Sequence, residues 1–192
     1  MEISAQFAKK ELRAKVLASL RQLSPAEREA AGAQARSLLR EQPIWKQARS
    51  VLLFAPLPDE LDVWPLLAAA LSAGKTVALP RFDSQTNGYV ASQVQNLVDD
   101  VKIGRFGIRE PTEKCSQIAL NRLDFILVPG VAFDMQGRRL GRGKGFFDRL
   151  LAVVRGTTCG VAFDEQIVRE IPVAPHDVHV NRILTPTRWV EP

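Results

Sequence analysis

Apolar residues recur at helical spacing along the first forty residues of the chain. Leucine and valine residues stand four positions apart between residues 4 and 22, which predicts an amphipathic helix there. The sequence SPAE has the form of a capping box, in which Ser24 caps a helix and Glu27 reaches back to it. A second helix is therefore predicted from Pro25, a favoured first helical residue, to about residue 41.

From residue 50 onward, short apolar runs alternate with helical patterns. Four runs are predicted as buried strands: SVLLFAP (50–56), KTVALP (75–80), DFILVPG (124–130) and TCGVAF (158–163). A helix over residues 62–74, closed by a glycine, joins the first two. This alternation predicts the α/β class: a three-layer sandwich whose central sheet is mostly parallel, in a single domain that spans residues 1–192.

The remaining segments carry weaker signals. They predict a strand over GYVASQV (88–94), a turn-rich loop over residues 99–111, a helix over residues 145–154 and one short strand in NRILTPTRW (181–189). No internal repeat or low-complexity segment interrupts the chain, which favours one compact unit.

Four segments at strand ends contain a proline or glycine followed by an acidic residue. These are APLPDE (55–60), LPRFD (79–83), VPGVAFD (128–134) and AFDE (162–165). Ligands of open α/β sheets bind outside the carboxyl ends of the parallel strands. We therefore expect the four segments to meet at one cleft.

The composition is that of an ordinary globular protein, with 46% hydrophobic and 24% charged residues. No apolar run approaches the ~20 residues that span a bilayer, and the first residues lack the apolar stretch of a signal peptide. The two cysteines, Cys115 and Cys159, suggest neither a disulfide framework nor a metal motif. These features predict a cytoplasmic protein, expected to be a monomer with no membrane partner.

The formal net charge of +5 admits two kinds of partner, a nucleic acid or a small anionic substrate. Aromatic residues are interleaved with basic ones only at residues 142–149, whereas nucleic-acid surfaces combine the two more widely. The sequence therefore favours a small anionic substrate and no nucleic acid.

The stretch GRRLGRGKGFFDR, residues 137–149, places three alternate glycines among basic residues. Gly141, Gly143 and Gly145 let the backbone approach a ligand closely, and the surrounding charges indicate an anion. The stretch lacks the serine or threonine of a P-loop, and its glycine spacing differs from the dinucleotide fingerprint. It is predicted as a phosphate loop of another kind, followed by a helix whose N-terminus faces the anion; the alternative is a solvated surface turn.

Several acidic side chains near the predicted cleft are candidate ligands. Asp148 either complements the dipole of the predicted helix or holds a Mg²⁺ ion that bridges phosphates. Asp62 is interpreted as a helix cap, and Glu60 as an acceptor for ring N–H groups. The sequence HDVH (176–179) has metal-like spacing, but no further Cys or His lies nearby, so a zinc site is disfavoured and Asp177 is the better ligand for a hard cation.

Residues 127–151, LVPGVAFDMQGRRLGRGKGFFDRLL, resemble the signature of the 5-formyltetrahydrofolate cyclo-ligases, also called methenyltetrahydrofolate synthetases. That signature runs from a hydrophobic strand through Pro-Gly and Phe-Asp to Gly-x-Arg-Leu-Gly-x-Gly-x-Gly-Tyr-Tyr-Asp. The resemblance extends to AKKELR, PDELDV, GKTVALPR and PVAPHDVHVNRILTP, and so covers nearly the whole chain. It implies a fold related to sugar-phosphate isomerases and CoA transferases. It also implies ATP-dependent cyclisation of 5-formyltetrahydrofolate to 5,10-methenyltetrahydrofolate, with release of ADP and phosphate.

The glycine-rich loop and the resemblance together assign roles to residues of this chain. Catalysis would fall to Arg142, Lys144 and Phe147. ATP would contact Lys9, Lys10, Arg13, Arg139, Leu140, Gly141, Arg142, Gly143, Lys144, Gly145, Phe146 and Phe147. The reduced folate, with or without a polyglutamate tail, would bind Glu60, Phe106 and Phe146. Mg²⁺ would bind Asp148 and Asp177.

The chain departs from the family pattern at three positions. Phe146 and Phe147 stand where the family has paired tyrosines, and Asn181 stands where an acid is common. The loss of one hydroxyl that stabilises a transition state would cost about 10²–10³-fold in rate. The alternative to an active enzyme is therefore a drifted paralogue that binds folate or nucleotide without this turnover.

Overall fold

The computed structural model describes residues 2–104, 107–172 and 177–192, and its centre is an eight-stranded sheet in the order β13-β12-β10-β7-β1-β2-β3-β6. Five neighbouring strands run parallel: β12 (Arg182–Leu184), β10 (Thr157–Val161), β7 (Phe125–Pro129), β1 (Ser50–Leu52) and β2 (Thr76–Asp83). Antiparallel pairing adds β13 (Trp189–Val190), β3 (Gly88–Val94) and β6 (Gln117–Ile118) toward the edges. The prediction of a mostly parallel sheet is confirmed.

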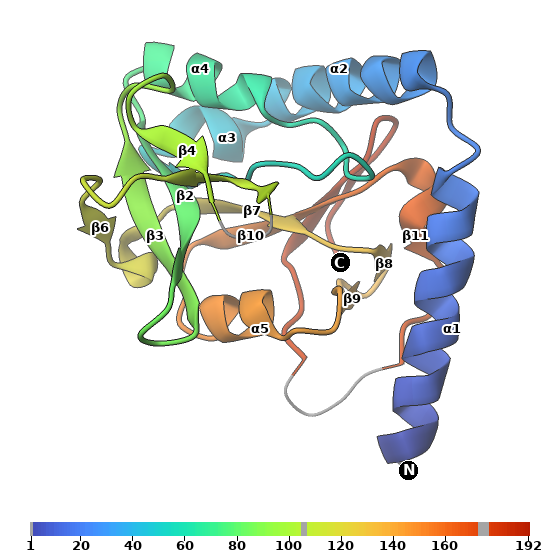
Figure 1. The fold of residues 1–192 in the computed structure, drawn as a ribbon. Coiled ribbons are helices and arrows are strands. Elements are labelled where there is room, and N and C mark those ends of the chain that lie inside the picture. Colours follow the sequence, from blue (N-terminus) through green and yellow to red (C-terminus); the bar gives the residue numbers. More distant parts are fainter. Residues whose placement is uncertain (1, 105–106, 173–176) are drawn as a thin grey trace.

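Helices lie on both faces of the sheet and complete the three predicted layers (Figure 1). One face is covered by α2 (Pro25–Glu41), α3 (Pro43–Gln47) and α4 (Pro65–Ser72), and the other by α5 (Phe146–Leu151). The long α1 (Glu2–Leu20) runs down one side of the molecule (Figure 1). The capping box of α2 forms as predicted: Ser24 Oγ accepts from the Glu27 backbone N–H, and Glu27 accepts from that of Ser24.

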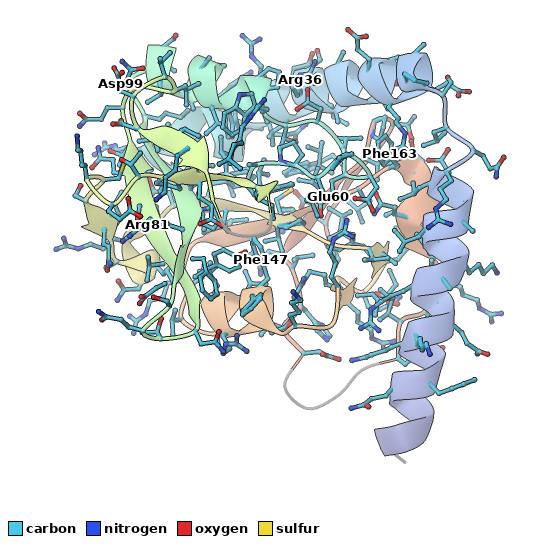
Figure 2. The ribbon with its side chains drawn as sticks, in the orientation of Figure 1. Arg36, Glu60, Arg81, Asp99, Phe147 and Phe163 are labelled. Atoms are coloured by element: carbon cyan, nitrogen blue, oxygen red, sulfur yellow. The ribbon has the colours of Figure 1, made fainter. Side chains whose placement is uncertain are left out.

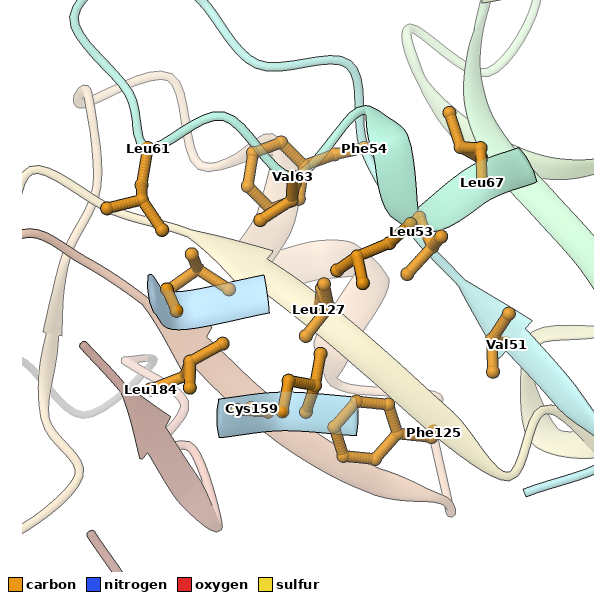
Figure 3. Packing of buried hydrophobic residues seen from close by; sticks show 14 of the residues in the cluster. Val51, Leu53, Phe54, Leu61, Val63, Leu67, Phe125, Leu127, Cys159 and Leu184 are labelled. Carbon is orange, nitrogen blue, oxygen red and sulfur yellow. The ribbon is translucent and has the colours of Figure 1, made fainter. Parts of the chain in front are cut away.

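Alternate residues of the parallel strands enter two separate hydrophobic clusters, so both faces of the sheet are buried. The cluster beneath α2, α3 and α4 includes Val51, Leu53, Phe125, Leu127 and Cys159 (Figure 3). The intervening residues Leu52, Ile126 and Val128 pack with Leu150 and Leu151 of α5. Complete burial raises the pKa of the Cys159 thiol, which marks it as a core residue and not a reactive one.

A second, three-stranded sheet consists of β8 (Ala132–Asp134), β9 (Arg139–Leu140) and β11 (Ile167–Val168), which lies beside α1 in Figure 1. Two short 3₁₀ turns, η2 (Leu120–Arg122) and η3 (Asp164–Gln166), complete the main elements. The glycine-rich loop leaves β9 and enters α5, so this small sheet anchors one of its ends. None of the helices that the structure describes is long and apolar enough to cross a membrane.

Three sequence predictions about this chain are wrong in detail. Within the range 99–111, where a loop was predicted, β4 (Val101–Ile103) and β5 (Arg109–Pro111) pair as antiparallel strands. The C-terminal segment holds two strands, β12 and β13, instead of one. The helix predicted over residues 145–154 is α5, which has only six residues, so we assign no anion site to its N-terminus.

Candidate active site

A cavity of about 360 Å³ opens at the carboxyl ends of β1, β2 and β7. Three of the four segments predicted to meet there do so, and they contribute Ala55 and Glu60, Pro80, and Pro129 with Gly130. The fourth, AFDE, does not line the cavity. Its Asp164 accepts hydrogen bonds from the hydroxyls of Thr185 and Thr187, at 2.7 and 2.8 Å, and so holds the C-terminal turn.

Most acids at these strand ends cap turns and do not face the cavity. Asp83 accepts from the backbone N–H of Gln85, and the buried Asp134 accepts from those of Gln136 and Arg138. Such local bonds are typical of aspartate in turns. Glu60 is the exception, because its side chain lines the cavity.

The glycine-rich loop forms one wall of the cavity. Gly143 and Gly145 have φ values of 94° and 65°, in the left-handed region where a side chain is strained. The loop is also tied to α1, because Nε of Arg13 donates to the carbonyl oxygen of Gly141 at 2.7 Å. The exposed Lys144 of this loop also lines the cavity. The loop thus has a defined path, contrary to a loosely solvated turn.

Two basic residues assigned to ATP form ion pairs with the two residues assigned to magnesium. Nη2 of Arg139 lies 2.5 Å from Oδ1 of Asp148, and Nζ of Lys9 lies 2.5 Å from Oδ2 of Asp177. The Arg139 side chain is only 3% exposed, so its buried charge is stabilised by Asp148 and by the hydrogen bond to the Pro129 carbonyl oxygen instead of by water. Lys10, by contrast, is exposed on α1.

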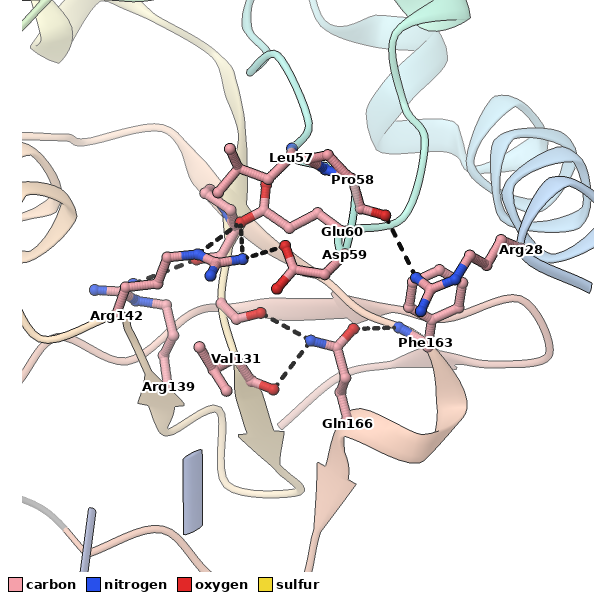
Figure 4. Close-up of polar contacts among 12 residues, drawn as sticks. Arg28, Leu57, Pro58, Asp59, Glu60, Val131, Arg139, Arg142, Phe163 and Gln166 are labelled. Carbon is pink, nitrogen blue, oxygen red and sulfur yellow. Dashed lines mark hydrogen bonds and ion pairs between the residues drawn. The ribbon is translucent and has the colours of Figure 1, made fainter. Parts of the chain in front are cut away.

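A third ion pair joins the glycine-rich loop to the loop after β1 (Figure 4). Nη2 of Arg142 lies 2.6 Å from Oδ1 of Asp59 and 3.3 Å from Oε1 of Glu60. The other Glu60 oxygen accepts from the backbone N–H of Leu57 at 3.0 Å. Burial raises the pKa of Glu60, although the Leu57 hydrogen bond and the Arg142 charge oppose the rise.

A buried glutamine fixes the floor of the cavity near Gly130. Nε2 of Gln166 donates to the carbonyl oxygens of Gly130 and Val131, at 2.9 and 3.0 Å, and its Oε1 accepts from the Phe163 backbone N–H (Figure 4). Each polar atom of this side chain therefore has a partner, which is expected of a buried amide. The bonds hold the Pro-Gly turn after β7 in place.

The wall opposite the charged loop is aromatic. Phe146 and Phe147 of α5 line the cavity together with Tyr89 of β3. The Tyr89 ring packs against Phe146 with centroids 5.4 Å apart and against Phe147 at 6.2 Å. Figure 2 shows Phe147 on α5, separated from Glu60 on the loop after β1. The cavity thus has a cationic side that could bind phosphate groups and an aromatic side.

The carboxylates near the cavity are too few to hold a magnesium ion alone, but they fit an ion that also binds the phosphates of a ligand. In the part of the chain that the structure describes, no group of three or more His, Cys, Asp or Glu side chains could hold a metal. Mg²⁺ commonly takes one or two protein carboxylates and substrate phosphates as ligands. Asp148 suits this role because it lines the cavity, whereas Asp177 lies outside the lining and is held by Lys9.

The model of the 5-formyltetrahydrofolate cyclo-ligase family matches residues 5–186. The chain belongs to this family. It is 32% identical over 172 residues to the 5-formyltetrahydrofolate cyclo-ligase of Escherichia coli K12, covering 88% of this chain and 94% of the relative. The corresponding mouse protein is 29% identical over 198 residues, covering 95% of each chain.

Solved structures agree with this assignment. The NMR structure of Aquifex aeolicus 5,10-methenyltetrahydrofolate synthetase matches with a TM-score of 0.87 and 36% identity, over 95% of this chain and 92% of the other. A 5,10-methenyltetrahydrofolate synthetase from Mycoplasma pneumoniae matches with a TM-score of 0.73 at 20% identity, over 93% and 98%, and supports the fold alone.

Several residues assigned to a ligand from the family resemblance do not line the cavity with their side chains. The side chain of Leu140 is buried in the core, 1% exposed, so only its backbone could meet a nucleotide. Lys9, Lys10 and Arg13 lie on α1 outside the cavity lining, and Arg13 contacts the glycine-rich loop. Phe106 lies outside the described residues, as does the first histidine of HDVH, His176.

The asparagine that departs from the family pattern has a structural role. Oδ1 of Asn181 accepts from both the backbone N–H and the hydroxyl of Thr158, each at 2.9 Å. The neutral amide oxygen accepts from both donors, and these hydrogen bonds connect the residue before β12 to β10. Asn181 is therefore accounted for by strand pairing.

Sequence reasoning missed Tyr89 and Glu110, which both line the cavity. Glu110 is 4% exposed; its Oε2 accepts from the Phe82 backbone N–H, while its Oε1 is buried without a hydrogen-bond partner. Burial raises the pKa of Glu110. The signal for Tyr89 was present, because a hairpin after a strand that ends at the cleft returns its next strand to the same edge.

Proposed function

We propose that this chain catalyses the ATP-dependent cyclisation of 5-formyltetrahydrofolate to 5,10-methenyltetrahydrofolate, with release of ADP and phosphate. The observation that carries the proposal is one cavity lined by a glycine-rich cationic loop, an aromatic wall and the carboxylate of Glu60, in a chain of this family. That it acts as a cytoplasmic monomer stays a prediction from the sequence.

The reaction has two steps, and neither needs a protein nucleophile. The formyl oxygen attacks the γ-phosphorus of ATP, and the bond from that phosphorus to the bridging oxygen breaks. ADP departs, and the formyl group on N5 has become an imidate phosphate. N10 then attacks the former formyl carbon and loses its proton, and phosphate departs with the former formyl oxygen. Such phosphoryl transfer depends on positioning and on neutralisation of charge.

The phosphates would lie against the glycine-rich loop. Lys144 would place its ammonium on the transferring phosphate, and Arg142 would exchange its carboxylate partners for phosphate oxygens. Lys9, Lys10, Arg13, Arg139 and the backbone of residues 139–147 would complete the nucleotide site. Mg²⁺, when bound, would neutralise phosphate charge, with Asp148 and then Asp177 as its protein ligands.

The folate would occupy the aromatic side. Its ring would stack near Phe146 and Phe147, and Glu60 would accept hydrogen bonds from ring N–H groups. Release of Arg142 toward phosphate would leave Glu60 free to do so. Phe106, which the family resemblance also assigns to folate, keeps that assignment as a prediction.

A spectrophotometric assay tests the proposal. The methenyl product absorbs in the near ultraviolet, so enzyme, ATP, Mg²⁺ and 5-formyltetrahydrofolate together should give a steady absorbance gain. The drifted-paralogue alternative predicts folate or nucleotide binding by calorimetry without that gain. Under this alternative, restoring tyrosine at both Phe146 and Phe147 should raise the rate.

Glu60→Gln is expected to raise KM for 5-formyltetrahydrofolate about tenfold, with kcat and KM for ATP within about twofold of wild type. The substitution keeps the size of the side chain and removes the charge that accepts ring N–H groups. Steady-state kinetics in both substrates measure the split. Asp59→Asn is the matched control, because Asp59 pairs with Arg142 outside the cavity lining; an equal rise of KM in both variants would show that only the ion pair matters.

A further inference from the structure

The aromatic wall of the cavity carries one hydroxyl group, that of Tyr89. Tyr89 is the only tyrosine among the 192 residues. It is the second residue of β3 and stands opposite Phe82 near the end of β2, and this register places it at the carboxyl edge of the sheet. Its ring meets Phe146 nearly edge-on, with an interplanar angle of 85°.

The Tyr89 hydroxyl is distinct in chemistry from the rest of the lining. Every other polar side chain that the structure describes around the cavity is an acid or a base. The acids can accept hydrogen bonds and the bases carry positive charge, so a neutral donor from a side chain comes from Tyr89 alone within this described lining. Phe146 and Phe147 supply rings there without hydroxyls.

The hydroxyl is available to a ligand. Tyr89 is half-buried, and no described residue accepts a hydrogen bond from its hydroxyl. Burial raises the pKa of Tyr89, and the charge of Glu110 nearby adds to the rise, so the phenol stays protonated. A buried phenol usually finds a hydrogen-bond partner, and here the cavity is where one can arrive.

We propose that Tyr89 is a further substrate-binding residue, whose hydroxyl donates a hydrogen bond to an oxygen of a flat ring system seated against Phe146 and Phe147. The inference rests on the proposed function, in which that ring is the reduced pterin. Glu60 then accepts from ring N–H groups while Tyr89 donates to a ring oxygen. The two residues together match a substrate that presents both donors and an acceptor.

Tyr89→Phe in the full chain tests the assignment, because it removes the hydroxyl and keeps the ring. Calorimetry with 5-formyltetrahydrofolate and, separately, with ATP should show folate affinity falling about tenfold and ATP affinity changing less than twofold. KM for the folate should rise in parallel, with kcat changing little. The thermal midpoint should stay that of wild type, since no described bond of the fold is lost.

Thr86→Val is the matched control. Thr86 lies in the same hairpin, its hydroxyl bonds Asp83, and it does not line the cavity, so folate affinity should stay at the wild-type value. Wild-type folate affinity in Tyr89→Phe, or an equal loss in Thr86→Val, would overturn the assignment. A wild-type protein that neither binds nor converts the folate would overturn the proposed function itself, and this inference with it.

Discussion

Lys144→Ala is expected to lower kcat for methenyltetrahydrofolate formation about 10²–10³-fold, the cost of losing one group that stabilises a transition state. The ammonium lies in the glycine-rich loop and lines the cavity on the side assigned to phosphate. Charge develops on the transferring phosphoryl group during the reaction, so the loss should fall on kcat more than on KM for the folate. Steady-state kinetics at saturating folate measure it.

The loop should remain folded in this variant. Lys144 is exposed, so the free energy of unfolding should change by less than about 0.5 kcal/mol. Lys15→Ala, an equal change of charge at an exposed position on α1, should keep wild-type kcat. Wild-type kcat and KM for ATP in Lys144→Ala would mean that the glycine-rich loop does not bind the reacting phosphate.

Asp148→Ala is expected to lower the free energy of unfolding by about 3 kcal/mol, because it leaves the charge of Arg139 buried without its carboxylate. The Arg139 side chain is 3% exposed, and its Nε already lacks a hydrogen-bond partner among the described residues. Urea unfolding with an unchanged m-value would measure the loss.

A substitution in an exposed ion pair serves as the control, because it removes a charge without leaving its partner buried. Asp59→Asn removes the charge that pairs with Arg142. The side chains of Asp59 and Arg142 are 36% and 41% exposed, so the free energy of unfolding should fall by less than about 1 kcal/mol. The double variant Arg139→Met, Asp148→Ala should recover much of the loss, because no charge is then buried. Equal small losses in Asp148→Ala and Asp59→Asn would contradict the view that the Arg139–Asp148 pair is a buried one.

Local signals in the sequence predicted the elements that depend on local chemistry. The capping box at Ser24 and the continuous apolar run that predicted β7 as a buried strand needed only neighbours along the chain, and both are confirmed. The β4–β5 hairpin was missed because its strands are three residues long and half exposed, so no period of two could be seen. Glu110 of β5 also accepts from the backbone N–H of Phe82 in β2, a contact between residues 28 apart in the sequence.

The site was predicted residue by residue but not as pairs. Glycine spacing and basic charge pointed to the loop, and the acids were identified as separate ligands. The structure instead joins Arg139 to Asp148 and Lys9 to Asp177, contacts that span 9 and 168 residues. Such pairs arise only when the small sheet, α1 and α5 pack together. Tyr89 differs, since its place follows from the local register of the neighbouring strands β2 and β3, and it was missed although that signal was present.

The most direct test of the central claim is the stoichiometry of one reaction. Wild-type protein is mixed with ATP, Mg²⁺ and 5-formyltetrahydrofolate, and ADP and the methenyl product are quantified in the same quenched samples. We expect one ADP per methenyltetrahydrofolate, and neither product above background when either substrate is left out. Methenyl product without ADP, ADP without methenyl product, or no product at high enzyme would contradict it.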